Sequence, residues 1–474
     1  MSDESVWDVV VIGAGSAGLP AAIHAADRGA RVLLLDADNR IGGTLHWSSG
    51  QMSAAGTRLQ REKGIDDTPA EHFDDVNRIT RGTVDQGVTR LVIDHAAATI
   101  DWLTDIGYQP LPDHPVAGQT HEPYRVRRYV WGEEAGISVL RVLEPLLEEH
   151  VRAGRVTLQL STRFERFICD EAGAVTGVEA RNGNDELVTY TGRNVVLTTG
   201  GYAASETLWR KHTGQWPLRS LCNPYSRGDG LEAAEAIGVS IERGDQFLCT
   251  FAGYLTDPAD PKSAWFFPLA PTDRKPWEIY VNAEGRRFVR EDHPSIDHLE
   301  NHLLNEPDTR MFIVYDEGIR QNAPSFFLPE ADGTTADRHF GQRPGFWTAQ
   351  TIDDLAAQMG VDSSRLQQTI DGYNEAVDSG HDPEFGRQHL IRPIGKPPFF
   401  AVEAGGVTVV SPGGVAINDN LQVVRGDGMP VPNLYAAGEV CGFARFSGRA
   451  FAGGMSLTPA LTAGRLLGQK LLNL

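Results

Sequence analysis

The first part of the chain shows two apolar runs separated by small and glycine-rich residues. Residues 7–12 are mostly β-branched and apolar, as is typical of a strand buried on both faces of a parallel sheet. Residues 17–28 have small side chains at helical spacing, Gly29 follows as a C-terminal cap, and residues 31–36 form a second apolar run. This pattern predicts a βαβ unit of about 30 residues, the length that a crossover helix requires.

Further apolar patterns predict both helices and strands up to the C-terminus. Helical periodicity covers residues 68–107 and 139–152, and a final helix begins at about Leu457. Short alternating segments at 156–160, 174–180 and 188–191 predict a small antiparallel meander.

The composition of the chain changes in its middle. Between residues 247 and 406, proline, aromatic and charged residues become common and long apolar runs disappear, whereas glycine-rich, strand-like segments return afterwards. This change indicates an inserted domain. We therefore predict an α/β fold in which residues 1–246 and 407–474 form one Rossmann-type domain, split in the sequence, around an inserted α+β domain at 247–406.

The turn after the first predicted strand carries the pattern G-x-G-x-x-G. Gly13 allows the tight turn, Gly15 lets the backbone approach a pyrophosphate, and Gly18 lets the helix pack closely on the strand. Asp36 ends the second strand, where a carboxylate accepts hydrogen bonds from ribose hydroxyls and repels a 2′-phosphate. Together these features predict a dinucleotide other than NADP, bound at a helix N-terminus.

Charge and cysteine content exclude several classes of partner. The net charge of −20 and the pI of about 5.1 argue against nucleic acid and anionic membranes, which both need basic patches. No motif for haem or iron–sulfur clusters involves any of the four cysteines. The acidic N-terminus does not resemble a signal peptide, and the glycine turn interrupts the longest uncharged stretch, residues 9–26. These observations predict a soluble, cytoplasmic protein with reduced thiols and no membrane span, but specify no oligomeric state.

Two further segments favour FAD as the dinucleotide. Residues 39–44 and 435–439 resemble FAD-binding elements of two-domain flavoproteins. No second G-x-G-x-x-G followed by an acidic residue is present, which argues against a separate NAD site. Electrons are therefore expected to come from, or go to, a separate donor or acceptor.

Longer motifs resemble one flavoprotein family over nearly the whole chain. It contains soluble fumarate reductases, succinate dehydrogenase flavoprotein subunits, urocanate reductase and 3-ketosteroid dehydrogenases. Residues 42–57 match the family loop along the flavin, residues 280–291 match the capping-domain segment that carries the catalytic acid of fumarate reductases, and residues 432–440 match the loop to the last strand of the FAD domain. The site pattern is closest to 3-ketosteroid dehydrogenases, and the resemblance implies that the inserted domain caps an FAD-binding domain.

The resemblance also implies which residues hold FAD. Covalent members of the family carry histidine at the position that aligns with Leu45, and His46 is one residue away, so we predict non-covalent FAD. The predicted cofactor residues are Gly13, Gly15, Ser16, Ala17, Gly18, Asp36, Ala37, Gly42, Gly43, Thr44, Ser49, Gly50, Gln51, Met52, Phe164, Thr199, Gly200, Gly201, Asp229, Gly438, Glu439, Ser456 and Leu457.

Family members share one chemistry. A hydride passes between flavin N5 and the carbon β to a carbonyl or carboxylate, and a proton passes at the α carbon. The resemblance implies an enzyme that introduces or reduces a C=C bond in a cyclic ketone, enone, ketosteroid-like molecule or monocarboxylate. Two alternatives stay open: a fumarate- or succinate-type enzyme that uses Arg449, Arg445 and the cluster around Arg125, and a flavoprotein subunit of a larger electron-transfer complex.

The proton-transfer position departs from both family patterns. Fumarate reductases place an arginine, and 3-ketosteroid dehydrogenases a tyrosine, where this chain has Ser295. A serine hydroxyl is too weak an acid to act alone, but it can relay a proton through His293 or Asp297. His293 and Ser295 are therefore the candidate proton-transfer residues, and the alternative is that His293 and Asp297 only hold the loop.

The substrate clamp departs as well. Arg449 aligns with one fumarate-binding arginine and is a candidate catalytic residue, or else a salt-bridged structural arginine, while residues 407–409 contain no counterpart of the family histidines. The spacing of residues 448–454 resembles the ketone-binding segment of 3-ketosteroid dehydrogenases, with Phe451 in place of its tyrosine and backbone N–H groups near Gly454 still present. The further substrate-binding candidates are Tyr254 and Arg445, and no metal ligands are predicted.

Overall fold

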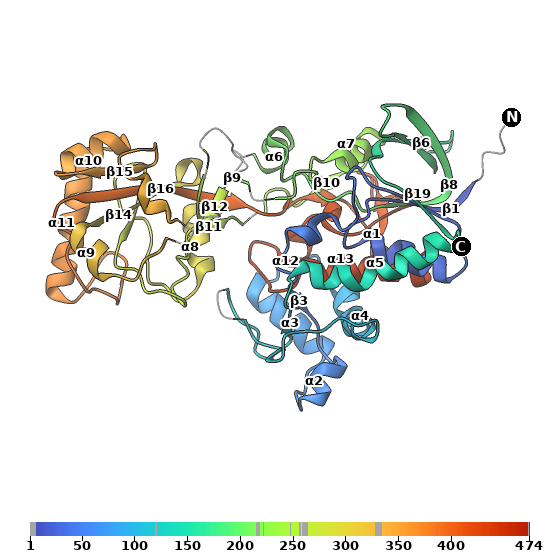
Figure 1. The fold of residues 1–474 in the computed structure, drawn as a ribbon, viewed down its shortest axis with the longest axis horizontal. Coiled ribbons are helices and arrows are strands. Elements are labelled where there is room, and N and C mark those ends of the chain that lie inside the picture. The colour runs from blue at the N-terminus through green and yellow to red at the C-terminus, as the bar shows by residue number, and fades with distance from the viewer. Residues whose placement is uncertain are drawn as a thin grey trace.

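A computed structural model describes residues 6–118, 121–214, 219–220, 222–246, 248–255, 257, 264–327, 334–472 and 474. Phe247, where the inserted domain is predicted to begin, lies outside the described residues. The molecule is elongated, with the sheet that contains β1 in one half and the sheet that contains β14 in the other (Figure 1).

The nucleotide-binding half is built on a largely parallel sheet with the strand order β18-β19-β8-β1-β2-β5. Every residue of β2 is buried, as are the last four of β1, which agrees with the uninterrupted apolar runs in the sequence. The strands of this path are β1 (Trp7–Ile12), β2 (Val32–Leu35), β5 (Val156–Gln159), β8 (Leu187–Leu197), β18 (Gln422–Val424) and β19 (Pro430–Ala436).

Helices from both ends of the chain cover this sheet. α1 (Gly18–Asp27) follows the glycine turn and packs against α5 (Gly136–Arg152) and α13 (Leu457–Leu466), and α13 continues into the π-helical turn η5 (Leu467–Leu471). The predicted helical stretch at 68–107 divides into α3 (Pro69–Thr80) and α4 (Gln86–Asp105), and α2 (Arg58–Glu62) lies beside α4. The contact of α1 with α13 confirms a Rossmann-type domain that is split in the sequence.

The predicted meander is partly wrong. The segment at 156–160 forms β5, which pairs in parallel with β2 at the edge of the main sheet. The meander consists of β6 (Arg163–Cys169), β7 (Val175–Arg181) and the first half of β8, whose second half pairs with β1 and β19. The polar alternation in the first half of β8 and the apolar run in its second half suggest two strands, although they form one.

The other half contains the predicted capping domain, a seven-stranded, mostly antiparallel sheet centred on β16. β16 continues past residue 406 and pairs with β9, which precedes residue 247, so those two boundaries stay predictions. Its strands are β9 (Arg219–Ser220), β11 (Thr250–Leu255), β12 (Ala264–Phe266), β13 (Ile279–Asn282), β14 (Arg310–Asp316), β15 (Phe346–Ala349) and β16 (Phe399–Thr408), and its helices are α8 (Ile296–Leu303), α9 (Glu317–Asn322), α10 (Ile352–Met359) and α11 (Ser363–Ser379).

Short elements complete the described chain. Within the ranges given above, no helix is both long and apolar enough to cross a membrane, and all four cysteines are free thiols. The short elements are η1 (Gly43–His46), β3 (Met52–Ser53), β4 (Tyr129–Val130), α6 (Glu206–Thr213), α7 (Asp229–Ala236), β10 (Ile241–Glu242), η2 (Pro307–Thr309), η3 (Ala336–His339), β17 (Gly414–Val415), η4 (Glu439–Cys441) and α12 (Ala444–Ser447).

Candidate functional site

A cavity opens where β1, β2 and β8 end, the position at which open α/β sheets bind ligands. It contains about 1110 Å³ of space free of protein atoms, including solvent at its mouth. Most of the predicted cofactor residues line this cavity, namely Gly13, Gly15, Ser16, Ala17, Asp36, Ala37, Gly43, Thr44, Phe164, Thr199, Gly200, Asp229, Gly438, Glu439, Ser456 and Leu457.

The remaining predicted cofactor residues lie outside this lining. Three of them are glycines at which a side chain would collide with a neighbouring group. A Cβ on Gly18 would lie 1.8 Å from the carbonyl oxygen of Gly13, and one on Gly201 would lie 2.4 Å from Glu439 Oε1. A Cβ on Gly50 would lie 2.3 Å from the backbone of Ala135. These contacts give the three glycines a packing role. The others outside the lining are Gly42, Ser49, Gln51 and Met52.

The glycine turn has the geometry that a bound dinucleotide requires. Gly13 has a φ of +108°, which disfavours any other residue, and a Cβ there would lie 2.3 Å from the carbonyl oxygen of Thr198. A Cβ on Gly15 would meet no atom within 4 Å, so open space adjoins the backbone there. Thr199 Oγ1 belongs to a cavity-lining residue and is buried with no hydrogen-bond partner among the described residues. The glycine turn therefore offers space, and the segment after β8 offers an unsatisfied polar group, to a ligand in this cavity.

Asp36 is anchored at the end of β2. Its Oδ2 accepts the backbone N–H of Ala14 at 2.6 Å and its Oδ1 accepts the N–H of Asp38 at 2.8 Å. Burial raises the pKa of this carboxyl, although the two backbone donors oppose the shift. The carboxylate is thus held in place at the cavity wall, with lone pairs left for hydroxyl groups.

Glu439 reaches the same cavity from the C-terminal part of the chain. Its Oε1 accepts both the N–H of Ser411 at 2.9 Å and the Ser411 hydroxyl at 3.1 Å. Ser411 Oγ in turn accepts the N–H of Tyr202 at 2.6 Å. Burial raises the pKa of Glu439. Ser411 is missed by the sequence motifs, because it follows β16 and no glycine pattern marks it.

The geometry around Leu45 bears on covalent attachment. Leu45 lines the cavity, whereas His46 turns back so that its Nε2 lies 2.8 Å from the carbonyl oxygen of Ile41. His46 also contacts the space beside Gly42, where a Cβ would lie 2.9 Å from its Nε2. The only nearby histidine in sequence is therefore engaged with the backbone, which supports non-covalent binding.

A second group of residues gathers where the predicted capping domain meets the segment 448–454. Gly454 has a φ of +77°, and a Cβ on it would lie 2.4 Å from the backbone nitrogen of Ser53. The Tyr124 hydroxyl donates to the carbonyl oxygen of Gly453 at 2.5 Å. Gly454 is buried, and its N–H has no acceptor among the described residues. This loop is therefore fixed in place while keeping an unsatisfied donor.

The predicted proton-transfer residues lie at the start of α8. The Ser295 N–H donates to His293 Nδ1 at 3.2 Å, and the Ser295 hydroxyl donates to Asp297 Oδ2 at 3.3 Å. The His293 ring stacks on His298, with ring centres 3.9 Å apart. Burial, followed by the neighbouring His293 and His302, lowers the pKa of His298 to about 4. Ser295 is thus linked to Asp297, whereas His293 belongs to a stack of histidines.

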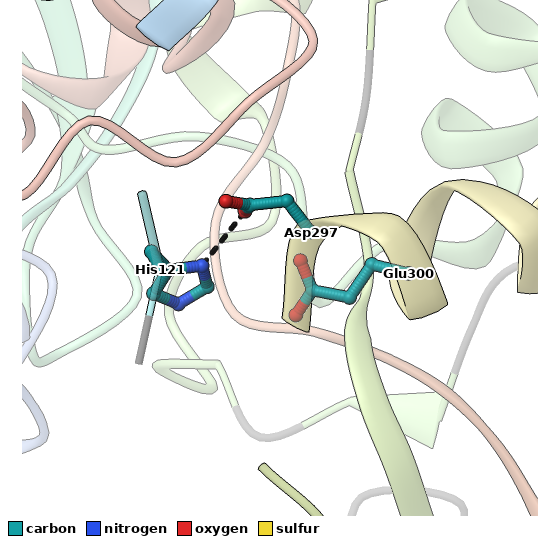
Figure 2. Close-up of side chains that lie close together, drawn as sticks. All are labelled: His121, Asp297 and Glu300. Carbon is teal, nitrogen blue, oxygen red and sulfur yellow. Dashed lines mark hydrogen bonds and ion pairs between the residues drawn. The ribbon is translucent and has the colours of Figure 1, made fainter. Parts of the chain in front are cut away.

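His121, like Ser411, is a candidate residue that the sequence motifs miss. Its Nδ1 lies 2.8 Å from Asp297 Oδ1, and its ring stacks on Phe451 at 4.2 Å between centres (Figure 2 shows the Asp297 contact). Glu300, one turn along α8, lies on the same side, and the ligand atoms of these three titratable residues are within 4.8 Å of one another. The signal in the sequence is weak: His121 only precedes the polar aromatic cluster at 124–129.

The candidate substrate arginines are both paired with acids. Arg445 is buried and interacts with Asp85, with Glu242 at 3.2 Å and with the carbonyl oxygens of Cys441 and Val415. Arg449 is exposed, with 61% of its side chain accessible, and pairs with Asp245 at 3.3 Å.

Tyr254 and the cluster at 124–129 also pack within the protein. Tyr254 lies on β11 and stacks on Phe267, with 4.4 Å between ring centres. Arg128, in the polar cluster, is buried between Asp67 at 2.7 Å and Asp75 at 3.0 Å. Within this cluster it is Tyr124 that reaches the segment 448–454, through its hydrogen bond to the carbonyl oxygen of Gly453.

Comparisons with known proteins agree with this geometry. The profile of the family described as FAD binding domain matches residues 8–457. The chain is 28% identical over 469 residues to the fumarate reductase (cytochrome) of Shewanella frigidimarina, covering 98% of this chain and 76% of that protein. It is 26% identical over 464 residues to the vinyl phenol reductase of Lactiplantibacillus plantarum, covering 91% and 89%.

A solved structure supports the fold. The 3-ketosteroid Δ1-dehydrogenase of Sterolibacterium denitrificans, in complex with 1,4-androstadiene-3,17-dione, matches with a TM-score of 0.77 at 21% identity, covering 98% of this chain and 99% of that chain. The match confirms the predicted fold class, a Rossmann-type domain with an inserted cap.

Proposed function

We propose that this chain, which belongs to the FAD binding domain family, acts on a neutral substrate such as a cyclic ketone or enone. The chain is an FAD-dependent oxidoreductase that acts on carbon–carbon double bonds. One observation carries this proposal. Of the two candidate arginines, Arg445 is buried and paired with two acids of the chain itself, and Arg449 is exposed and pairs with Asp245, so at most one of them is left for a substrate carboxylate.

The environment of Arg445 makes its release costly. Its guanidinium is 1% exposed and bonds to two acidic side chains and two carbonyl oxygens. Moving it towards a substrate would break its ion pairs with Asp85 and Glu242 and leave two carbonyl oxygens without this donor, and each buried polar group left unsatisfied costs about 1–3 kcal/mol. Arg445 is therefore structural, and the dicarboxylate alternative loses one of its clamps.

The segment 448–454 supplies what a ketone needs. The buried N–H of Gly454 can donate to a carbonyl oxygen, on which charge develops during the reaction. Phe451 adds an apolar wall, which suits a hydrophobic substrate better than a charged one. The names of two similar proteins, vinyl phenol reductase and 3-ketosteroid Δ1-dehydrogenase, also indicate substrates without a dicarboxylate.

The cofactor site supports non-covalent FAD held from both ends of the chain. Gly15, Asp36 and Thr199 would face it from the N-terminal part, and Glu439 from the C-terminal part. Bound FAD supplies the redox step, hydride exchange with the β carbon of the substrate. The electron donor or acceptor is a separate molecule, and a cytoplasmic location and domain limits at 247 and 406 stay predictions of the sequence.

A fumarate-type activity is the second candidate. It is favoured by the 28% identity to the fumarate reductase (cytochrome) over almost the whole chain. The ion pair of Arg449 with Asp245 is exposed, and such pairs contribute only about 0–1 kcal/mol, so a substrate carboxylate can compete for this arginine.

One experiment separates the two functions. The holoenzyme is reduced anaerobically and mixed in turn with cyclic enones, unsaturated monocarboxylates, a vinyl phenol and fumarate, while flavin absorbance reports reoxidation. We expect a neutral compound to reoxidise the flavin at least tenfold faster than fumarate. Faster reoxidation by fumarate than by every neutral compound would contradict the proposal.

A further inference from the structure

We propose that His121 and Asp297 form the proton-transfer pair of this enzyme, with His121 exchanging the proton and Asp297 positioning it. This inference rests on the proposed C=C chemistry. The two residues are separated by 176 positions in the sequence and come from the segment before β4 and from α8. Neither family pattern places a histidine–carboxylate pair at this point, where an arginine or a tyrosine is expected.

The hydrogen bond defines the state of the imidazole. Asp297 Oδ1 lies 2.8 Å from His121 Nδ1, and because a carboxylate only accepts, Nδ1 carries the proton (Figure 2). No described residue shares a hydrogen bond with Nε2 of His121. The nitrogen that points away from Asp297 is therefore the one that can exchange a proton, as in other histidine–carboxylate pairs.

Phe451 places this imidazole beside the substrate segment. The His121 and Phe451 rings are stacked, with 4.2 Å between centres and an angle of 30° between planes. Phe451 also approaches Phe443 at 6.2 Å, so the stack continues as an apolar wall. His121 thus lies next to Phe451, which precedes Gly454 by three residues in the same loop.

Asp297 is held by donors on both of its oxygens. Oδ2 accepts the Ser295 hydroxyl at 3.3 Å and the N–H of Glu122 at 3.1 Å, and Oδ1 faces His121. Glu122 directly follows His121, so the carboxylate fixes both the backbone and the side chain of this segment. Ser295, at the position of the family's proton donor, accordingly serves to orient Asp297.

Glu300 is the second carboxyl near His121. It is 1% exposed, its Oε1 accepts the N–H of Phe251 at 3.3 Å, and its Oε2 has no partner among the described residues. Burial, and next the charge of Asp297, raises its pKa well above the ordinary value. The raised pKa makes Glu300 ionise less readily than an exposed glutamate, and among the described residues it is Asp297, not Glu300, that shares a hydrogen bond with His121.

The chemistry balances in both directions. In reduction, the substrate would gain a hydride at its β carbon from FAD that the separate electron donor has reduced, and the doubly protonated imidazole of His121 would give its Nε2 proton to the α carbon, so that the C=C bond becomes a single bond and a neutral imidazole is left. His121 then recovers a proton from solvent. In the reverse direction the neutral imidazole would take the α proton at Nε2 while the hydride of the β carbon passes to oxidised FAD.

The test uses His121→Gln and Asp297→Asn in the FAD-loaded full chain, with His302→Gln as a control on the same helix. The substrate is the compound from the panel above that reoxidises the flavin fastest, fumarate included. The proton-transfer pair can therefore be tested even if the proposal of a neutral substrate is wrong. We expect His121→Gln to slow reoxidation by about 10²–10⁴-fold, and Asp297→Asn to slow it less and to enlarge the solvent deuterium isotope effect. FAD content, substrate affinity and reoxidation by an artificial dye should stay within threefold of the parent.

Three results would overturn the pair. One is that His121→Gln retains the parent rate. Another is that His293→Gln loses the rate while His121→Gln does not. The third is a stoichiometric divalent metal in the purified holoenzyme, lost in Glu300→Gln, whose removal by a chelator abolishes turnover, because His121, Asp297 and Glu300 would then be metal ligands.

Discussion

The backbone N–H of Ala14 donates to Oδ2 of Asp36 at 2.6 Å, which ties the glycine turn after β1 to the acidic end of β2. The two segments that must contact one nucleotide are thus joined to each other by the protein itself. Their arrangement therefore needs no ordering by the ligand, and ordering costs are among the main penalties of binding.

Asp36→Asn should weaken FAD binding without unfolding the chain. The amide keeps one acceptor oxygen but loses the charge and one of the two backbone contacts, which corresponds to about 1–1.5 kcal/mol or roughly tenfold in affinity. Titration of the apoprotein with FAD measures this change. Asp185→Asn, in the exposed turn between β7 and β8, is the control, and equal affinities in the two variants would contradict the role of Asp36.

Two glycine substitutions should separate packing from binding. A Cβ on Gly18 would lie 1.8 Å from the Gly13 carbonyl oxygen, so Gly18→Ala should destabilise the fold or prevent expression. A Cβ on Gly15 meets no protein atom within 4 Å, so Gly15→Ala should fold normally but carry much less FAD. Thermal unfolding and flavin absorbance distinguish the outcomes, and full FAD occupancy in Gly15→Ala would show that the cofactor does not approach this residue.

Arg128→Met should destabilise the protein strongly. This arginine is fully buried between Asp67 and Asp75, so its removal leaves the buried Asp67 carboxylate without its ion pair, takes one of three arginines from Asp75, and costs about 3–5 kcal/mol. The matched variant is Arg125→Met, whose exposed guanidinium also pairs with Asp75 and should contribute no more than about 1 kcal/mol. Urea unfolding of both variants tests the difference, which should be absent if burial does not matter.

Arg449→Gln should distinguish the two candidate functions. Because the ion pair with Asp245 is exposed, we expect the free energy of unfolding to change by less than about 1 kcal/mol. If the substrate is neutral, the rate of its reaction with reduced flavin should stay within threefold of the parent. A hundredfold loss would instead make Arg449 a substrate ligand, as its alignment suggests.

Stability should fall with rising pH because of Glu300. Burial raises the pKa of this carboxyl in the folded state, while in the unfolded chain it ionises near its ordinary value of about 4.3. Unfolding between these two values releases a proton, so the stabilising contribution is complete below about pH 4 and decreases as pH rises towards the folded-state pKa. Glu300→Gln removes this dependence, and its Tm relative to the parent should increase from pH 5 to pH 8 at saturating FAD. A constant difference would contradict the raised pKa.

The sequence predicts the nucleotide-binding core because its signals are local. The glycine turn, α1 and Asp36 follow one another within a single βαβ unit, so the residue types in this short segment are enough to predict its structure. β5 is misassigned because a short apolar run can join either a meander or a parallel sheet, and only its partner β2 decides.

The second group of residues is harder to predict because it depends on contacts between distant segments. Nothing near His121 in the sequence indicates that α8 will place Asp297 beside it. In the same way, the sequence around an arginine does not indicate which acids it will pair with. Arg445 and Arg449 therefore cannot be distinguished in the sequence, although Arg445 is buried and Arg449 is exposed.

β16 gives the molecule a mechanical property. It is the central strand of one sheet and runs towards the other half of the molecule (Figure 1). Only Val409 and Val410 separate its last residue from Ser411, whose N–H donates to Glu439. A rotation of the half that contains β14 would therefore be passed through only two residues to the serine that anchors this acid. Through this strand, the orientation of the half that contains β14 is coupled to the position of Glu439 in the wall of the nucleotide cavity.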